Sequence, residues 1–520
     1  MQGKKDYQEQ LFTHFQLSDY VPEDNFYRRL KGILNLDFLG SLTASYYGDC
    51  GQKSIDPRVF FKICLVGYLE NIISDRQLMT HCKMRLDILF FLDYNIDEEL
   101  PWHSTISRTR NLFPEAVYDE LFDKILGMCV EAGLVSGHSQ TIDSAPVKAN
   151  ASMDSLELKV PAEKLDDHIR RVRYMSSPDR QAKKDRASDD QKTLTASKGE
   201  QKALKSRNKH WSESQDERPG SKSKKAKYTS NKTHYSPTDP DAKISVKPGK
   251  SRKLNYLSQM AVDTAYHVIT DIHADYAHKK DNQYVEAITE RLRRRLEKQN
   301  LLWRNFVADT GYSSGENYSF LEREGLVSYI PPHGTYKGGP ADLIYFEQED
   351  CWLCSEGQKL TFRGTKTNTR GIKENHYATS RRDCKDCPIA GKCKGKSNER
   401  RVRVTYYKEE YERAIKRVKS KRGKAFKTIR QSTVEPVFGT LTQFLGLRKI
   451  NTKGIRNANK VMLMAGMAYN LKKLLKYQTR SAESMAQCVQ RGGEILIDIV
   501  GLIFGSKKLA LFNRPTRMIE

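Results

Sequence analysis

The chain has 520 residues, with 89 Lys and Arg against 64 Asp and Glu, a formal net charge of +25 at pH 7 and a pI near 9.4. This charge favours a polyanion such as nucleic acid as the partner and leaves a membrane surface as the weaker alternative. No apolar run reaches the ~18 residues of a membrane span, and the first residues hold no apolar signal-peptide core, so we expect a cytoplasmic protein.

The N-terminal part, residues 1–135, is predicted to be a helical DNA-binding domain, with helices from about residue 15 onward. Ser74 is a good cap for one helix. A short basic helix is expected over residues 103–110, capped by Ser104. Short helices that end in a basic one are typical of a helix-turn-helix unit, although a plain bundle with a solvated basic face explains the pattern equally well. The candidate DNA contacts here are Arg108 and Arg110.

A first strand, Thr141 to Asp143, is expected within residues 136–151. Residues 152–253 then form a basic insertion with almost no aliphatic core. Its segment 201–253 holds 15 Lys and Arg and 5 Asp and Glu. We expect much of this insertion to be disordered when free and to suit DNA phosphates, a solvated linker being the alternative.

Regular structure is expected again over residues 254–334. Asp281 and Ser314 are predicted to cap two helices that lie between strands, and one strand ends at Asp309. The predicted strands are Leu257 to Asp263, Val268 to Ala274, Phe306 to Ala308 and Val327 to Ile330. This order predicts an α/β fold with a mixed sheet flanked by helices.

The remaining chain is predicted to contain a basic, Cys-rich insertion over residues 335–425 and helices over residues 426–478. The tail, residues 479–520, has one apolar patch that is too short to span a bilayer.

Three carboxylates, Asp143, Asp309 and Glu435, lie inside or beside apolar runs of this basic chain. Carboxylates on rigid strands and helices can hold two divalent ions, which activate a nucleophile and stabilise the leaving oxygen of a phosphodiester. Mg²⁺ prefers such hard oxygen ligands and keeps several waters, so two or three carboxylates suffice.

Other aspartates compete for the second of these positions. Asp239 and Asp241 lie in a turn-like Thr-Asp-Pro-Asp context, which favours a cap or turn role. Asp263 lies in a predicted central hairpin, where it could orient the metal ligands without binding the metal itself.

Five cysteines between residues 351 and 393 form two Cys-x-x-Cys pairs and one further thiol. Paired motifs of this kind favour a structural zinc ion, which needs four ligands, so one cysteine is spare. Buried free thiols are the alternative. The five are Cys351, Cys354, Cys384, Cys387 and Cys393.

The chain resembles the DDE-type transposases of bacterial insertion sequences, whose catalytic core has the RNase H-like fold. The matching stretches are Thr-Ile-Asp143-Ser-Ala-Pro-Val-Lys-Ala-Asn150-Ala, Ser236-Pro-Thr-Asp-Pro-Asp-Ala242, Asp309-Thr-Gly-Tyr-Ser-Ser-Gly-Glu-Asn317, Glu435-Pro-Val-Phe-Gly-Thr-Leu441 and Gly446-Leu-Arg-Lys-Ile-Asn-Thr-Lys-Gly-Ile455. Together with the N-terminal helical region, the resemblance covers roughly residues 15 to 478.

The resemblance implies that Asp143, Asp309 and Glu435 are the catalytic residues and bind Mg²⁺ or Mn²⁺. It also favours Cys354, Cys384, Cys387 and Cys393 as the zinc ligands, with Cys351 in place of Cys393 as the alternative.

One position departs from the family pattern. Many relatives have a basic residue seven positions after the glutamate, where this chain has Thr442. Arg430 lies near, but not at, the position of an arginine that often accompanies the glutamate. The further candidate DNA contacts are Arg430, Arg448, Lys449 and Lys453.

The predicted function is that of a transposase that binds the terminal inverted repeats of its element, cuts there and joins the 3′-hydroxyl ends to target DNA. Such a protein would be nucleoid-associated and a homodimer on double-stranded DNA. The alternatives are an inactive or domesticated DNA-binding protein and an RNase H-like nuclease without strand transfer.

Overall fold

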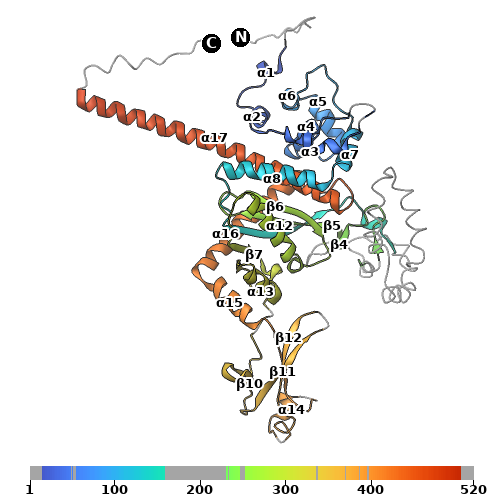
Figure 1. The fold of residues 1–520 in the computed structure, drawn as a ribbon, viewed down its shortest axis with the longest axis vertical. Helices are drawn as coiled ribbons and strands as arrows, with labels where there is room; N and C mark the ends of the chain where they lie inside the picture. Colours follow the sequence, from blue (N-terminus) through green and yellow to red (C-terminus); the bar gives the residue numbers. More distant parts are fainter. Residues whose placement is uncertain are drawn as a thin grey trace, which may run out of the picture.

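The computed structural model describes residues 15–48, 50, 54–158, 230–231, 234–245, 252–334, 336, 338–368, 371–385, 387–394 and 397–504, with side chains up to residue 479. Most of the predicted basic insertion therefore lies outside the described residues. Figure 1 shows helices at one end of an elongated molecule, a sheet in the middle and a small β lobe at the other end.

The N-terminal region is helical, as predicted. Its α-helices are α1 (Leu17–Tyr20), α2 (Phe26–Ile33), α3 (Phe38–Thr43), α4 (Pro57–Leu69), α5 (Asp75–Lys83), α6 (Leu86–Leu92), α7 (His103–Leu112) and α8 (Glu115–Glu131), with a 3-10 turn η1 (Ala44–Tyr46). Ser74 caps α5 by accepting a hydrogen bond from the Gln77 N–H. The predicted cap at Ser104 is wrong, because α7 starts one residue earlier and Trp102 precedes it without a side-chain cap.

The central sheet is mixed, as predicted for an RNase H-like core. Its strands are β1 (Ser139–Lys148), β4 (Lys243–Ser245), β5 (Lys253–Asp263), β6 (Ile269–Tyr276), β7 (Asn305–Ala308) and β8 (Val327–Tyr329). The strand order is β4-β5-β1-β7-β8, and β6 also pairs with β5. β5 is antiparallel to both β1 and β6, whereas β1, β7 and β8 run parallel.

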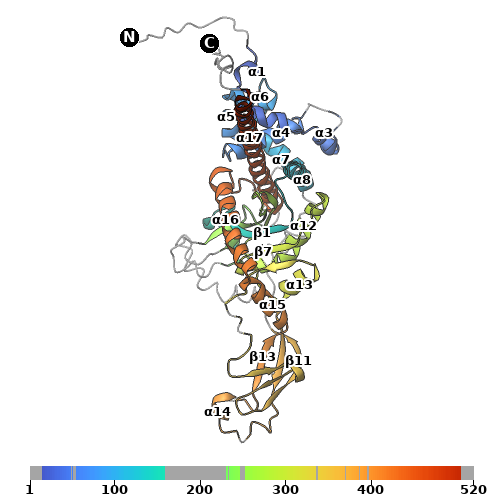
Figure 2. The ribbon, with the colours of Figure 1, turned by 90° about the vertical axis from the view of Figure 1, so that its left-hand side faces the viewer.

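Helices cover both faces of this sheet. On one face, α12 (Val285–Lys298) and α13 (Gly315–Arg323) pack against residues such as Ile142 and Phe306. The other face is covered by α8, α16 (Lys421–Phe444) and the first part of α17 (Ile455–Phe504). Figure 2 shows α16 crossing β1 and β7.

One expectation about the helix after β6 was wrong. Asp281 does not cap α12, because it begins a separate 3-10 turn, η5 (Asp281–Gln283), and Tyr284 precedes the helix. A second 3-10 turn, η6 (Thr310–Tyr312), follows β7, and Ser314 caps α13 as predicted by accepting from the Asn317 N–H.

The Cys-rich region is a second sheet with its own small core. Its strands are β9 (Ile344–Phe346), β10 (Cys351–Leu353), β11 (Lys359–Thr367), β12 (Lys373–Ala378) and β13 (Arg401–Thr405), accompanied by η7 (Glu347–Glu349) and α14 (Ala390–Cys393). Trp352, Leu360 and Tyr377 are buried there. The helix α15 (Lys408–Lys419) leads back to the central sheet.

Short pieces at the edges of the basic insertion are ordered into η2 (Met153–Ser155), β2 (Glu157–Leu158) and β3 (His234–Tyr235), and β2 pairs with β3. Within the described part of the chain, no helix is long and apolar enough to cross a membrane.

Candidate active site

Two of the predicted carboxylates are brought together by the register of β1 and β7. These strands are parallel, and Ile142 pairs with Ala308. The next residue on β1 is Asp143, and the next residue after β7 is Asp309. Because side chains alternate between the faces of a sheet, the Asp143 carboxylate lies on the face that α16 covers, opposite to Ile142, and Asp309 follows the end of β7 beside it.

The Asp143 carboxylate is mostly buried and paired. Its side chain is 19% exposed and accepts from Arg430 Nη1 at 2.9 Å and from the Ser144 N–H at 2.7 Å. Burial, followed by the charge of Asp309, raises the pKa of Asp143 to about 6, against the lowering effects of the Ser144 N–H and Arg430. The site therefore holds more negative charge than Arg430 alone neutralises.

A third carboxylate, Asp281, approaches the pair from η5. Ser144 Oγ donates to Asp281 Oδ1 at 2.6 Å. A Cβ placed on Gly311 would lie 3.0 Å from Asp309 Oδ1 and 3.1 Å from Asp281 Oδ2, so both oxygens border the same spot. Sequence reasoning assigned Asp281 to a helix cap. The signal available was the family stretch around Asp309, which gives no hint of a partner 28 positions upstream.

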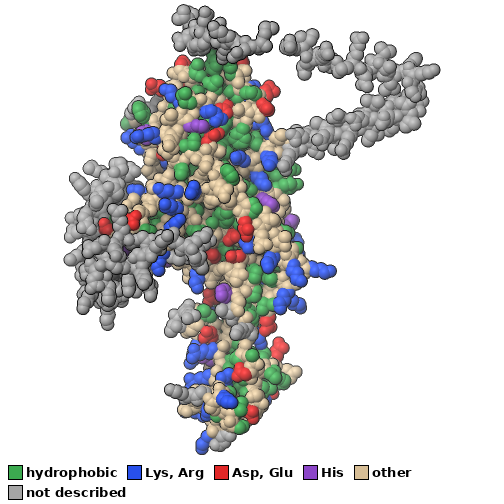
Figure 3. Space-filling model, turned by 180° about the vertical axis from the view of Figure 1, so that it is seen from behind, with side chains coloured by type: hydrophobic (Ala, Val, Ile, Leu, Met, Phe, Trp, Pro, Cys, Tyr) green, Lys and Arg blue, Asp and Glu red, His purple; other side chains and the backbone are tan. Residues whose placement is uncertain are grey.

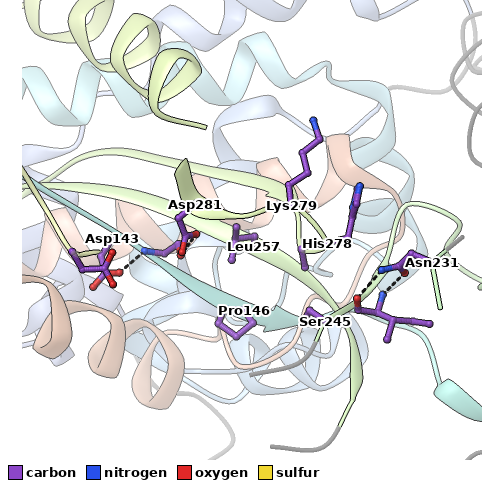
Figure 4. A pocket seen from close by; sticks show the side chains of 12 residues that line it. Asp143, Pro146, Asn231, Ser245, Leu257, His278, Lys279 and Asp281 are labelled. Atoms are coloured by element: carbon purple, nitrogen blue, oxygen red, sulfur yellow. Dashed lines mark hydrogen bonds between the residues drawn. The ribbon is translucent and has the colours of Figure 1, made fainter. Parts of the chain in front are cut away.

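These carboxylates line a cavity of about 350 Å³ at the end of β1. In Figure 4, Asp143 and Asp281 lie at one end and Asn231 and Ser245 at the other, with Pro146 and Leu257 between them. The rim carries His278 and Lys279, both exposed. The cavity thus joins an acidic end to a rim that bears a cation.

The structure does not bring Glu435 to this cavity. Glu435 is exposed on α16, five residues after Arg430, and it does not line the cavity. Five residues correspond to ~140° of rotation and ~7.5 Å along an α-helix, so the two side chains leave different sides of α16. Pro436, inside the helix, removes one backbone donor just after Glu435.

The donor chemistry of Asp143 and Asp309 fits a divalent cation. Both offer hard carboxylate oxygens beside a cavity with room for the waters that Mg²⁺ keeps. Across the described residues, however, no three His, Cys, Asp or Glu side chains converge closely enough to hold a metal ion. Asp143 and Asp309 are therefore suitable ligands for a divalent cation, but together they do not form a complete metal site.

The competing aspartates serve the framework. Asp239 is buried and accepts from Tyr256 Oη at 2.7 Å, and Asp241 accepts from the Ile455 N–H at 2.9 Å. Asp263 is buried and accepts from the Gly137 N–H at 2.9 Å and from Gln140 Nε2 at 2.8 Å. Asp263 pairs in register with Gln140, three residues before Asp143, which places it away from the cavity.

Two of the predicted DNA contacts already pair with carboxylates, and the others show no such pair among the described residues. Arg110 donates two hydrogen bonds to Asp75, at 2.7 and 2.9 Å, and Arg430 pairs with Asp143, so both guanidinium groups already have carboxylate partners. Arg108, Arg448 and Lys453 are exposed, and Lys449 is half-buried. Figure 3, seen from the side opposite to Figure 1, shows Lys and Arg side chains over both the helical region and the small lobe.

Three of the predicted zinc ligands lie near one another. Burial raises the pKa of the Cys393 thiol, the nearby Arg400 lowers it, and the charges of Cys354 and Cys384 raise it further. Cys354 Sγ accepts from the Gln358 N–H at 3.3 Å. Cys351 is buried within β10 instead. The described cysteines do not reach the geometry of a metal site, as stated above.

Comparison with known proteins gives two family matches. Residues 15–112 match a model described as a transposase domain, DUF772, and residues 353–475 match a model described as a transposase DDE domain. The first match contains α7, and the second contains Arg430, Glu435 and four of the five clustered cysteines. Neither includes Asp143 or Asp309. No curated protein matches the chain.

Proposed function

Because this chain belongs to the DDE-type transposases of insertion sequences, we propose that it binds the terminal inverted repeats of its own insertion element, cuts there and joins the freed 3′-hydroxyl ends to target DNA. The observation that supports this most is that Asp143 on β1 and Asp309, directly after the adjacent parallel strand β7, line one cavity. A homodimer, holding two ends together, and association with the nucleoid are parts of the same proposal.

Asp143 and Asp309 would hold Mg²⁺ or Mn²⁺, with Glu435 as the third ligand by the family pattern. Such ions, when bound, activate the attacking hydroxyl and stabilise the leaving oxygen. Without them, Arg430 neutralises Asp143 and keeps its carboxylate oriented by a charge-assisted hydrogen bond. For Glu435 to join the two aspartates, α16 would have to turn so that its Glu435 side faces β1, and this turn would release Arg430 from Asp143.

We also propose one structural zinc ion in the small lobe, held by Cys354, Cys384, Cys387 and Cys393. The closeness of Cys393 to Cys354 and Cys384, whose charges raise its pKa, favours Cys393 over Cys351 as the fourth ligand. Thiolate ligands that close all four positions give zinc a folding role and no chemistry.

The direct test is cleavage of a labelled duplex that carries the element's own end, taken from DNA that flanks the gene, with Mg²⁺ or Mn²⁺. We expect metal-dependent cutting at the end and joining to a second duplex. Asp143→Ala, Asp309→Ala and Glu435→Ala should each abolish both steps while DNA binding persists. Glu409→Ala, at an exposed glutamate on α15, is the matched control and should cut normally.

Two results would change the proposal. Tight binding without cutting, under either metal, favours a DNA-binding protein without catalysis. Cutting without joining favours a nuclease.

A further inference from the structure

The cavity that Asp143 and Asp309 line has a third carboxylate, Asp281, to which the proposed function assigns no role. Asp281 comes from η5, the turn between β6 and α12. Burial raises the pKa of Tyr312 well above its usual value, and the charges of all three carboxylates raise it further, with that of Asp281 first. The three carboxylates therefore lie close enough together to act on one buried hydroxyl group.

Ser144 connects Asp281 to Asp143 through its backbone and its side chain. Its N–H donates to Asp143 Oδ1 at 2.7 Å, and its Oγ donates to Asp281 Oδ1 at 2.6 Å. The cross-strand neighbour of Ser144 is Gln259, which is fully buried and whose Oε1 accepts from Tyr312 Oη at 2.6 Å. Within the part of the chain that the structure describes, Gln259 Nε2 has no hydrogen-bond partner. Because a buried donor needs an acceptor, this amide is suited to a water beside Ser144.

Asn317, in the first turn of α13, fastens the turn that carries Asp281 to the turn that follows Asp309. Asn317 Nδ2 donates to the Asn282 carbonyl of η5 at 2.8 Å and to the Tyr312 carbonyl of η6 at 2.9 Å. The Asn317 N–H is itself fixed by Ser314 Oγ at 3.1 Å. One amide group thus sets the distance between the two turns.

The second oxygen of Asp281 borders Asp309. A Cβ on Gly311 would lie 3.0 Å from Asp309 Oδ1 and 3.1 Å from Asp281 Oδ2, so a side chain there would push the two oxygens apart. Across the described residues, however, no three such ligands converge closely enough to bind one ion directly. Because Mg²⁺ keeps several of its waters, a carboxylate at this somewhat greater distance is suited to act on the ion through a water.

We propose that Asp281 is a positioning residue of the metal site, which accepts a hydrogen bond from a water of the ion held by Asp143 and Asp309, and that Asn317 keeps Asp281 in this place. This inference rests on the proposed function, because it requires an ion at the two aspartates. In the alternative, Asp281 only anchors η5 by accepting from Ser144. Groups that act on a metal from outside its ligand shell typically change its affinity about 10- to 100-fold when they are removed.

The test measures Mn²⁺ binding to the full-length protein without DNA, by electron paramagnetic resonance at about pH 8, where Asp143 is ionised. Asp281→Asn keeps the size of the side chain and an acceptor for Ser144 Oγ but removes the charge, so we expect Mn²⁺ to bind about tenfold more weakly. Ser144→Ala removes the hydrogen bond and leaves the charge, so it should weaken binding less. Wild-type Mn²⁺ binding by Asp281→Asn would overturn the proposal, and a loss in Ser144→Ala alone would show that Asp281 is only an anchor.

The role of Asn317 is tested in two backgrounds. Asn317→Ala removes both donors and should weaken Mn²⁺ binding in the otherwise wild-type protein. Added to Asp281→Asn, it should weaken binding no further, because Asn317 acts through Asp281. Equal losses in both backgrounds would overturn this role, since the loss would then come from elsewhere in α13. If Asn317→Ala does not fold, Asp281→Asn alone decides the proposal.

Water-proton relaxation by the bound Mn²⁺ tests whether Asp281 acts through water. Asp281→Asn should leave the relaxation per bound ion unchanged, because a carboxylate that bonds only to a water frees no position on the ion. Higher relaxation would overturn this part of the proposal, since it would mean that a water has replaced Asp281 as a direct ligand.

Two variants separate this inference from the proposed function. Asp143→Asn should abolish the Mn²⁺ binding that Asp281→Asn weakens, and wild-type binding by Asp143→Asn would refute the metal site itself. Asp154→Asn is the matched control, because Asp154 also accepts from a serine hydroxyl, Ser152 Oγ, at 3.1 Å but does not line the cavity. This control should bind Mn²⁺ like the wild type. An equal loss in the control would overturn the inference, because net charge alone would then explain the effect of Asp281→Asn.

Discussion

A buried carboxylate loses the solvation of its charged form, and this loss must be offset by a partner or by protonation. Asp143 uses both routes. Arg430 and the Ser144 N–H stabilise the charge, while burial and Asp309 raise the pKa of Asp143 to about 6. Near neutral pH the carboxylate is therefore mostly ionised, and its pKa lies close enough to neutral for protons to compete with the metal ion proposed to bind there.

Replacing Arg430 with Met should raise the pKa of Asp143 above about 6, because a neighbouring guanidinium favours the ionised form. Protons then compete with metal up to a higher pH. When Mn²⁺ affinity is measured as the pH is lowered, the part of the affinity that depends on Asp143 should be lost with a midpoint at a higher pH than in the wild type. An unchanged midpoint would mean that Arg430 does not govern the charge of Asp143.

Replacing Asp281 with Asn should have the opposite effect. Asn keeps the shape and can still accept from Ser144 Oγ, but it removes a negative charge that raises the pKa of Asp143. The same Mn²⁺ titration should show a midpoint shifted downward by a few tenths of a pH unit, less than the Arg430 effect because no direct bond joins the two carboxylates. A shift upward would contradict the placement of Asp281.

At the scale of helices and strands, local patterns in the sequence were sufficient for most of the sheet and for the caps at Ser74 and Ser314. Those patterns act over a few residues. The approach of Asp281 to Asp309 depends on how η5 folds back over the sheet, which no local pattern encodes. Glu435 was assigned from a family motif, and a motif does not show which side of α16 faces β1.

The turn around Asp239 offers a test of how strongly the segment between α16 and α17 is bound to the central sheet, because Asp239 accepts from the Gly454 N–H. Asp239→Ala should lower the free energy of unfolding by about 1–3 kcal/mol, because it leaves Tyr256 Oη and the Gly454 N–H without their acceptor. The Tyr256→Phe substitution removes one of these orphaned donors. A double-mutant cycle by urea unfolding should give a coupling of at least ~0.5 kcal/mol. Additive effects would show that the hydrogen bond contributes little.

The small lobe has few buried residues for its size, so a metal would matter to it. Purified protein should contain equimolar zinc, and the Cys384→Ser and Cys387→Ser double variant should lose it. Cys351→Ser is the matched control, because Cys351 is a buried thiol of β10 outside the proposed ligand set. If Cys351→Ser lost zinc and Cys393→Ser kept it, Cys351 and not Cys393 would be the fourth ligand.

At the scale of the whole molecule, the helical region and the central sheet share one hydrophobic core. It runs from Tyr27 and Phe61 through α8 to Ile272 of β6 and Leu463 of α17. The predicted boundary at residue 135 therefore separates sequence patterns and not independent packing units. The core of the small lobe, around Trp352, is distinct from it.

This shared core predicts that Phe61→Ala destabilises the central sheet as well as the helices. Phe61 is fully buried against Phe113 and Tyr118, so its truncation should cost about 3–5 kcal/mol. In calorimetry, one main transition containing both regions should move down in temperature, while a transition of the small lobe should stay in place. Variants that keep only one tryptophan distinguish the parts by fluorescence, because Trp303 packs in the sheet layer and Trp352 in the small lobe. The contrary result would be a Trp303 signal that keeps its midpoint while helix content melts at a lower temperature. The helical region would then be an independent domain, joined to the central sheet only by the hydrogen bonds of the segment between α16 and α17.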